Sequence, residues 1–142
     1  MKPLITFLLL NIFLSTVFAQ EKVSEISFGS AGMIGFYESI IIRQDSTFVF
    51  KKSGDININI KFLTSKETWE RLINSISQYS LKDLENPPSP SHAREYDGAL
   101  FSVIAISTNL KKYDCGQFDD YNPNEKLKPL MGIMLESKNV KL

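Results

Sequence analysis

A strict alternation of apolar and polar side chains between Asp55 and Phe62 constrains the fold more than any other feature of the chain. The segment reads Asp-Ile-Asn-Ile-Asn-Ile-Lys-Phe, with an apolar residue at every second position. Successive side chains of a strand point to opposite faces, so this period predicts a strand with one buried and one wet face. Such a strand is typical of an antiparallel sheet that is covered on one side only.

The hydrophobic period changes directly after this strand. Thr64 and Glu67 have the spacing of a capping box, which predicts that a helix starts there. Apolar residues then recur at helical spacing on one face: Trp69, Leu72, Ile73, Ile76 and Tyr79. We therefore expect an amphipathic helix that packs against the sheet.

The rest of the chain adds five segments typical of strands and a second helix. The strand segments are rich in β-branched and aromatic residues and bounded by turn residues: residues 22–28, 36–43, 47–52, 99–108 and 111–118. The second helix is expected to be capped by Asn122, with Pro123 at its first position. Its apolar face is Leu127, Leu130, Met131, Met134 and Leu135. This order predicts an α+β fold, an antiparallel sheet of five to six strands with two helices packed on one face.

The first 19 residues are typical of a secretory signal peptide. One basic residue, Lys2, precedes an apolar stretch, and the small residues Val17 and Ala19 stand where a signal peptidase requires them. The apolar stretch is shorter than the roughly 20 residues of a spanning helix. We expect cleavage after Ala19 and a secreted or periplasmic protein, residues 20–142, that forms a single domain without a membrane span.

Charge and composition exclude several functional classes. The 142 residues hold 16 basic and 16 acidic side chains, so no field is present that would gather the phosphates of a nucleic acid. A single cysteine excludes an internal disulfide, and a single histidine excludes most zinc sites and catalytic triads. No cofactor motif is found, and we expect a protein that is not an enzyme.

One cluster of acidic and amide side chains has part of the residue pattern of a calcium-binding loop. Asp120, Asn122 and Asn124 have the spacing of positions 1, 3 and 5 of such a loop. Glu125 and Met131, however, stand where the loop needs glycine and a bidentate glutamate. The cluster is therefore interpreted as the start of a helix, and no metal site is expected.

The lone histidine, His92, lies in a proline-rich segment near Glu95 and Asp97. A catalytic histidine needs a nucleophile and an orienting acid, and the sequence shows no Gly-x-Ser-x-Gly motif. A surface histidine is the favoured interpretation. The alternative is a small hydrolase that uses His92 with Asp97, Asp114 or Asp119.

The lone cysteine, Cys115, falls on an expected strand. A buried small apolar side chain is the favoured interpretation, because free cysteines are among the most buried residues. A reactive thiol and a half-cystine to a partner chain are the alternatives.

The segment from Gly29 to Gly35 is the most unusual local feature. It matches neither a phosphate loop nor a dinucleotide fingerprint. It is either a flexible connection or bulged strand crossing, where glycine permits positive φ, or a loop that presents backbone and two apolar side chains to a partner. The candidate binding residues are Gly29, Ser30, Gly32, Met33, Ile34 and Gly35.

No aromatic stripe interleaves with basic residues, so the sequence gives little support for stacking on sugars or bases.

The order of these parts resembles a known family. The Ser27–Gly32 segment, the run Leu81-Lys82-Asp83-Leu84 before prolines, Tyr96-Asp97-Gly98 before a strand, and a proline-led final helix with Leu127 and Leu130 carry the resemblance. This layout is similar to emfourin-type protein inhibitors of thermolysin-like metalloproteases, and to uncharacterised exported bacterial domains. It covers most of residues 23–136. Emfourin-like sequences tend to have Ser-Gly-Gly-Phe-Ala-Gly in the early segment, which Gly29 to Gly35 matches only in spacing and composition.

These observations together favour a small exported binding module that contacts a protein partner. The resemblance implies that the partner is a secreted protease and that the module inhibits it. Two other classes stay open: the small hydrolase built on His92, and a structural or assembly component whose edge strand pairs with another chain.

Overall fold

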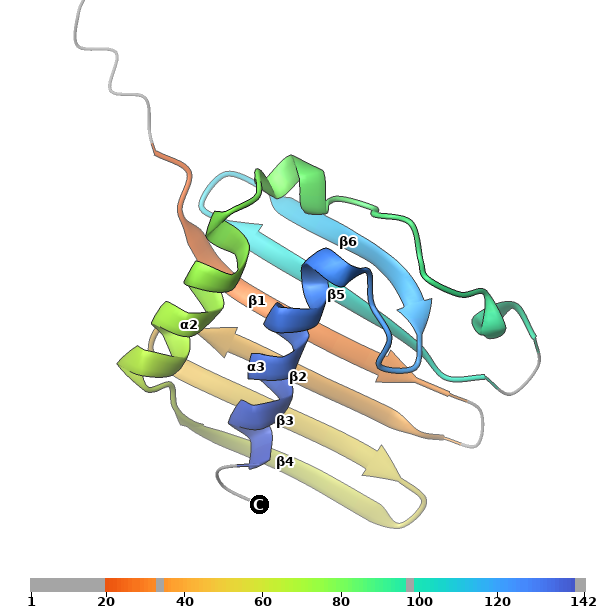
Figure 1. Cartoon of the computed structure of the whole chain (residues 1–142). Coiled ribbons are helices and arrows are strands. Elements are labelled where there is room, and N and C mark those ends of the chain that lie inside the picture. The colour runs from red at the N-terminus through yellow and green to blue at the C-terminus, as the bar shows by residue number, and fades with distance from the viewer. Residues whose placement is uncertain (1–19, 33–34, 97–98, 140–142) are drawn as a thin grey trace, which may run out of the picture.

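The computed structural model describes residues 20–32, 35–96 and 99–139. Six antiparallel strands form one sheet, and two helices lie side by side across one of its faces (Figure 1). The expected α+β fold, with two helices on one face of an antiparallel sheet, is therefore confirmed. The expected signal peptide, residues 1–19, lies outside the described residues.

The sheet has the strand order β4-β3-β2-β1-β5-β6. The bounds are β1 Val23–Ala31, β2 Tyr37–Arg43, β3 Ser46–Ser53, β4 Ile56–Leu63, β5 Phe101–Thr108 and β6 Lys112–Asp119. All six expected strands are present. The first is longer than expected, because Gly29, Ser30 and Ala31 continue its pairing with both β2 and β5.

Helix α2 spans Lys66–Ser77 and begins one residue later than the capping-box pattern predicts. Its cap is Ser65, whose hydroxyl accepts the backbone N–H of Thr68 at 3.0 Å. The hydroxyl of Thr64 instead forms a 2.8 Å hydrogen bond with that of Thr47 on β3. The expectation that Thr64 caps the helix was wrong, because β4 continues as far as Leu63 and leaves Thr64 beside the sheet.

Helix α3 spans Lys128–Asn139 and follows the short 3₁₀ helix η3, Glu125–Leu127. Asn124 caps η3 by accepting the N–H of Lys126 at 3.2 Å, so the expected cap at Asn122 was also wrong. Two more 3₁₀ helices that the periodicity does not predict, η1 (Leu81–Leu84) and η2 (Ala93–Glu95), lie between α2 and β5.

The core lies between the sheet and the two helices. Trp69, Leu72 and Ile76 of α2 are buried there, which confirms the expected helix face. Leu130, Met131 and Met134 of α3 are buried too, together with Leu127 of η3. On the sheet, the large fully buried side chains are Ile26, Phe28, Ile40, Ile42, Ile104, Ile106 and Phe118. Within the described ranges, no helix combines the length and the apolar run that crossing a bilayer requires.

Candidate functional site

The second face of the sheet carries no helix among the described residues (Figure 1). Strand register decides which side chains reach this open face. Small residues of β1 form its centre, at Ser27, Gly29 and Ala31, and larger side chains of the neighbouring strands flank them. We call this side of the sheet the open face.

Two aromatic side chains stand beside the last residue of β1. Tyr37 of β2 and Phe101 of β5 both pair with Ala31, one from each side. Their exposed fractions are 45% and 40%, which is high for large aromatic residues in paired strands. They bracket the point where the chain leaves the sheet for the turn between β1 and β2.

More aromatic rings continue this surface towards the β4 edge. The ring of Phe50 lies 5.5 Å from that of Tyr37, centroid to centroid. The ring of Phe48 is approached by Lys61 Nζ at 4.9 Å and by Arg43 Cζ at 5.5 Å. Such distances are typical of cation–π contacts.

No aromatic stripe interleaves with basic residues along the sequence, but the folded sheet brings Lys61 and Arg43 to the ring of Phe48. Phe48, Lys61 and Arg43 belong to three different strands, so their spacing along the chain does not reveal the contact. Cross-strand pairing brings them together, and only the register of the sheet could have shown it.

The expected binding segment divides between strand and turn. Gly29 and Ser30 are paired residues of β1, and the N–H of Gly32 donates to Phe36 O at 3.2 Å to close the turn. Gly35 has φ +72°, a conformation that favours glycine. Met33 and Ile34 lie outside the described residues. Because Gly29 and Ser30 belong to β1, the connection to β2 begins after Ala31 and not at Gly29.

Gly32 permits a close approach to the next loop. A Cβ atom at this position would lie 2.2 Å from Leu100 Cδ2. Leu100 precedes β5, so its packing against Gly32 joins the β1–β2 turn to the chain that leads into Phe101. Tyr37, Phe101 and the β1–β2 turn therefore lie together at one end of the sheet.

Ser30 points the other way, into the helix layer. It is buried in one row with Glu38 of β2 and Ser102 of β5. The Glu38 carboxylate accepts hydrogen bonds from Tyr121 Oη and Lys138 Nζ, both at 2.8 Å. Burial, followed by the bond to Glu38, raises the pKa of Tyr121. The side chain of Ser30 therefore does not reach the open face, and its backbone is paired within the sheet.

Asp119, at the end of β6, anchors the segment that runs along the β6 edge. Its carboxylate accepts a hydrogen bond from the Ser91 hydroxyl, and the N–H groups of Ala93 and Arg94 donate to it at 2.7 and 2.8 Å. The Arg94 guanidinium adds a contact at 3.2 Å. Burial alone would raise the pKa of Asp119, but these donors together hold it well below its ordinary value. The carboxylate is ionised and fully engaged in holding the loop.

Among the described residues considered for a hydrolase, no hydrogen bond joins His92 to Asp114 or to Asp119. His92 Nδ1 lies 2.9 Å from Glu95 Oε1, and both side chains are largely exposed. Asp114 accepts the N–H of Gly116 at 3.0 Å, while the Asp119 carboxylate accepts the N–H groups of Ala93 and Arg94. Asp97 lies outside the described residues. In the described part of the chain, no group of three His, Cys, Asp or Glu side chains is placed to hold a metal ion.

Cys115 is buried in the core on β6, as expected from its residue type. Burial raises the pKa of its thiol to about 12, with smaller contributions from Asp114 and Glu85. The thiol is therefore protonated at neutral pH and unreactive.

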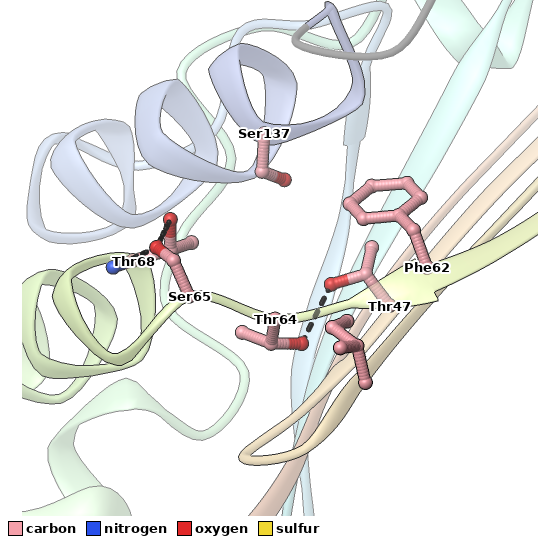
Figure 2. Close-up of a pocket in the computed structure, with 7 residues that line it drawn as sticks. Thr47, Phe62, Thr64, Ser65, Thr68 and Ser137 are labelled. Atoms are coloured by element: carbon pink, nitrogen blue, oxygen red, sulfur yellow. Dashed lines mark hydrogen bonds between the residues drawn. The ribbon is translucent and has the colours of Figure 1, made fainter.

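A pocket of about 190 Å³ lies where β3, β4 and both helices meet (Figure 2). Five of the seven residues that line it carry a hydroxyl group: Thr47, Thr64, Ser65, Thr68 and Ser137. Thr47 bonds to Thr64, Ser65 bonds to Thr68, and Ser137 donates to the carbonyl of Met134. The Thr47–Thr64 bond joins β3 to the residue before the α2 cap, the Ser65–Thr68 bond lies within that cap, and the Ser137 bond lies within α3. Each of these hydroxyl groups therefore already has a partner within the protein.

No protein-family model matches the chain, and no curated protein or solved structure matches it either.

Proposed function

We propose that this protein is an exported binding module that acts by surface contact, and that the open face around Tyr37 and Phe101 is its contact surface. One observation carries the proposal: two partly exposed aromatic side chains flank the end of β1, beside the turn that contains Gly32 and Gly35. Aromatic residues are enriched where proteins bind one another, because each covers a large area with few rotatable bonds.

The surroundings support a preformed surface. β1 is paired on both sides, and the Asp119 anchor fixes the segment before β5 at the same end of the sheet. A surface that is ordered before binding loses less conformational entropy when the partner arrives. Rigidity of this kind suits an inhibitor that acts without chemistry.

A secreted protease is the partner we propose first. The layout similarity to metalloprotease inhibitors supports this choice, and the turn between β1 and β2 supplies main-chain groups that an extended protease cleft could pair with. The binding residues of this proposal are Gly32 and Gly35 at the turn, with Tyr37 and Phe101 through their rings. Gly29 lies within β1, where its backbone is paired with the neighbouring strands.

The test is a panel of purified secreted proteases, including a thermolysin-like metalloprotease, together with generic esterase, glycosidase and phosphatase substrates. We expect inhibition of at least one protease at a near-stoichiometric ratio. Turnover of a substrate that disappears in the His92→Ala variant would contradict the proposal and establish the hydrolase instead.

Export is part of the same proposal. The pattern of residues 1–19 supports cleavage after Ala19, so the exported protein begins at Gln20. Mass analysis of the N-terminus checks this, and intact Met1 in a membrane fraction would contradict it.

A further inference from the structure

The β6 edge of the sheet is covered by another part of the chain, whereas the β4 edge is not paired with any described residue. The outer side of β6 is covered, because the N–H of Asn86 donates to Asp114 O at 2.9 Å and the loop with Ala93 and Arg94 is bound to Asp119. No described residue pairs with the outer side of β4. Proteins commonly protect such edges, because unpaired backbone groups are a template for another strand.

The β4 edge is long and regular. Its eight residues pair with β3 without a bulge and contain no proline. A two-residue turn, Gly54-Asp55 with φ +55° at Gly54, places Ser53 opposite Ile56. In a two-residue hairpin the residues that close the turn share hydrogen bonds, and bonded and non-bonded pairs then alternate. The backbone N–H and C=O groups of Asn57, Asn59 and Lys61 therefore point away from β3.

We propose that a second copy of this chain pairs with the β4 edge, antiparallel and around a two-fold axis at Asn59. The sequence of the strand is complementary to itself in this register. Ile58 stands opposite Ile60 of the second copy, Ile56 opposite Phe62, and Asn57 opposite Lys61. Apolar side chains then meet on the helix side, and polar side chains meet on the open face.

Registers shifted towards the C-terminal end of β4 fit less well. An axis at Ile60 places Leu63 opposite Asn57, and an axis at Lys61 places two ammonium groups opposite each other, which is destabilising. The register at Asn59 also covers Ile56, whose exposed fraction is 57% in the single chain. Seven residues of each strand pair in this register, from Ile56 to Phe62.

The resulting dimer has a continuous sheet of twelve strands. The two-fold axis is perpendicular to the sheet, so both helix layers lie on one side and both open faces on the other. This inference does not rest on the proposed function, since it concerns the edge of the sheet and not its face. It gives the protein two open faces that point in the same direction.

The test uses charge changes at Asn59, an exposed residue whose side chain lies at the axis. In sedimentation experiments from about 1 μM to about 1 mM, a range that covers weak and tight dimers, we expect the parent protein to dimerise. Asn59→Lys should weaken the dimer more than tenfold, because like charges then face each other across the axis. Asn59→Asp should weaken it less, because Lys61 of the other copy lies diagonally opposite. An equimolar mixture of the two variants should form a dimer more than tenfold tighter than either variant alone.

Asn74→Lys, the same change on an exposed part of α2, is the matched control and should leave the dimer unchanged. Circular dichroism of each variant verifies the fold. A parent protein that stays monomeric over the whole range would overturn the proposal. So would a dimer that neither change at Asn59 affects, or one that Asn59→Asp tightens.

Discussion

Glu38 of β2 and Lys138 of α3 form an ion pair, with 2.8 Å between the carboxylate Oε1 and the ammonium Nζ; the Glu38 side chain is buried and that of Lys138 is 17% exposed. The second oxygen of Glu38 accepts the hydroxyl hydrogen of Tyr121, so the carboxylate is satisfied on both sides. The contact joins the last turn of α3 to the start of β2. It fixes how the C-terminal helix lies across the core.

Removal of one partner of this pair should be costly. Glu38→Leu leaves the Lys138 ammonium without its carboxylate, and breaking a buried pair in this way costs about 3 kcal/mol or more of unfolding free energy. The double variant Glu38→Leu with Lys138→Met should recover a large part of that loss, because no charge is then left unpaired. Urea titration of the two variants checks this. A loss below about 1 kcal/mol for Glu38→Leu, as at ordinary surface sites, would show that the pair does not hold α3.

Trp69 should anchor α2 to the sheet. Its side chain is buried in the core, so Trp69→Ala should lower the free energy of unfolding by about 3–5 kcal/mol through lost contacts and a cavity. Glu70→Ala, on the exposed side of the same helix, is the control and should change stability by less than about 0.5 kcal/mol. Equal effects of the two substitutions in denaturant titrations would contradict the assigned helix face.

Asp119 should stabilise the fold at neutral pH and lose this effect in acid. Its pKa is lower in the folded chain than its ordinary value of 3.8, so its contribution is present above that value and disappears as the pH falls below it. Asp119→Asn should therefore be less stable than the parent at pH 7, and the difference should shrink below about pH 4. Asp120→Asn is the control, since Asp120 is exposed and its positive φ suits asparagine.

Hydrogen exchange gives a local readout of the same anchor. The amides of Ala93 and Arg94 donate to Asp119, so Asp119→Asn should speed their exchange while the amides of β1 stay protected. Unchanged exchange at both positions would mean that the loop is held by other contacts.

Cys115 should make the fold sensitive to alkali. The thiol has a pKa of about 12 when folded and an ordinary value of 9.0, so between these values the unfolded chain loses a proton that the folded chain keeps. The free energy of unfolding should then fall as the pH rises above about 9. Tyr113 and Tyr121 have raised pKa values as well, but both remain in a Cys115→Ala variant. Its stability should decline less steeply between pH 9 and 11, and equal slopes would contradict a buried thiol.

Periodicity along the chain predicted the elements well, because burial on one face imposes it. The alternation from Ile56 to Phe62 and the helical spacing from Trp69 to Ile76 both correspond to real elements. The caps were misplaced by one and two residues, since the choice among Thr64, Ser65, Asn122 and Asn124 depends on where the neighbouring strand or turn ends. The neighbouring residues in the sequence do not show which of these polar residues caps the helix.

The surface was harder to predict than the fold. The glycines near the β1–β2 turn are close together in the sequence and can be recognised there. Tyr37 and Phe101 are 64 positions apart and meet only through their shared pairing with Ala31. Glu38 and Lys138 are 100 positions apart and meet only because α3 packs on the sheet. Contacts across the sheet follow from register, and single-sequence patterns do not contain it.

The most direct test of the open face is a titration of a thermolysin-like metalloprotease with the parent protein and with a Tyr37→Ser, Phe101→Ser double variant. Leu110→Ser, which removes an exposed apolar side chain from the β5–β6 turn at the other end of the sheet, is the matched control. We expect near-stoichiometric inhibition by the parent and the control, and an inhibition constant more than tenfold weaker, about 1.4 kcal/mol, for the double variant at unchanged melting temperature. Equal inhibition by all three proteins, or inhibition by none of them, would contradict this expectation.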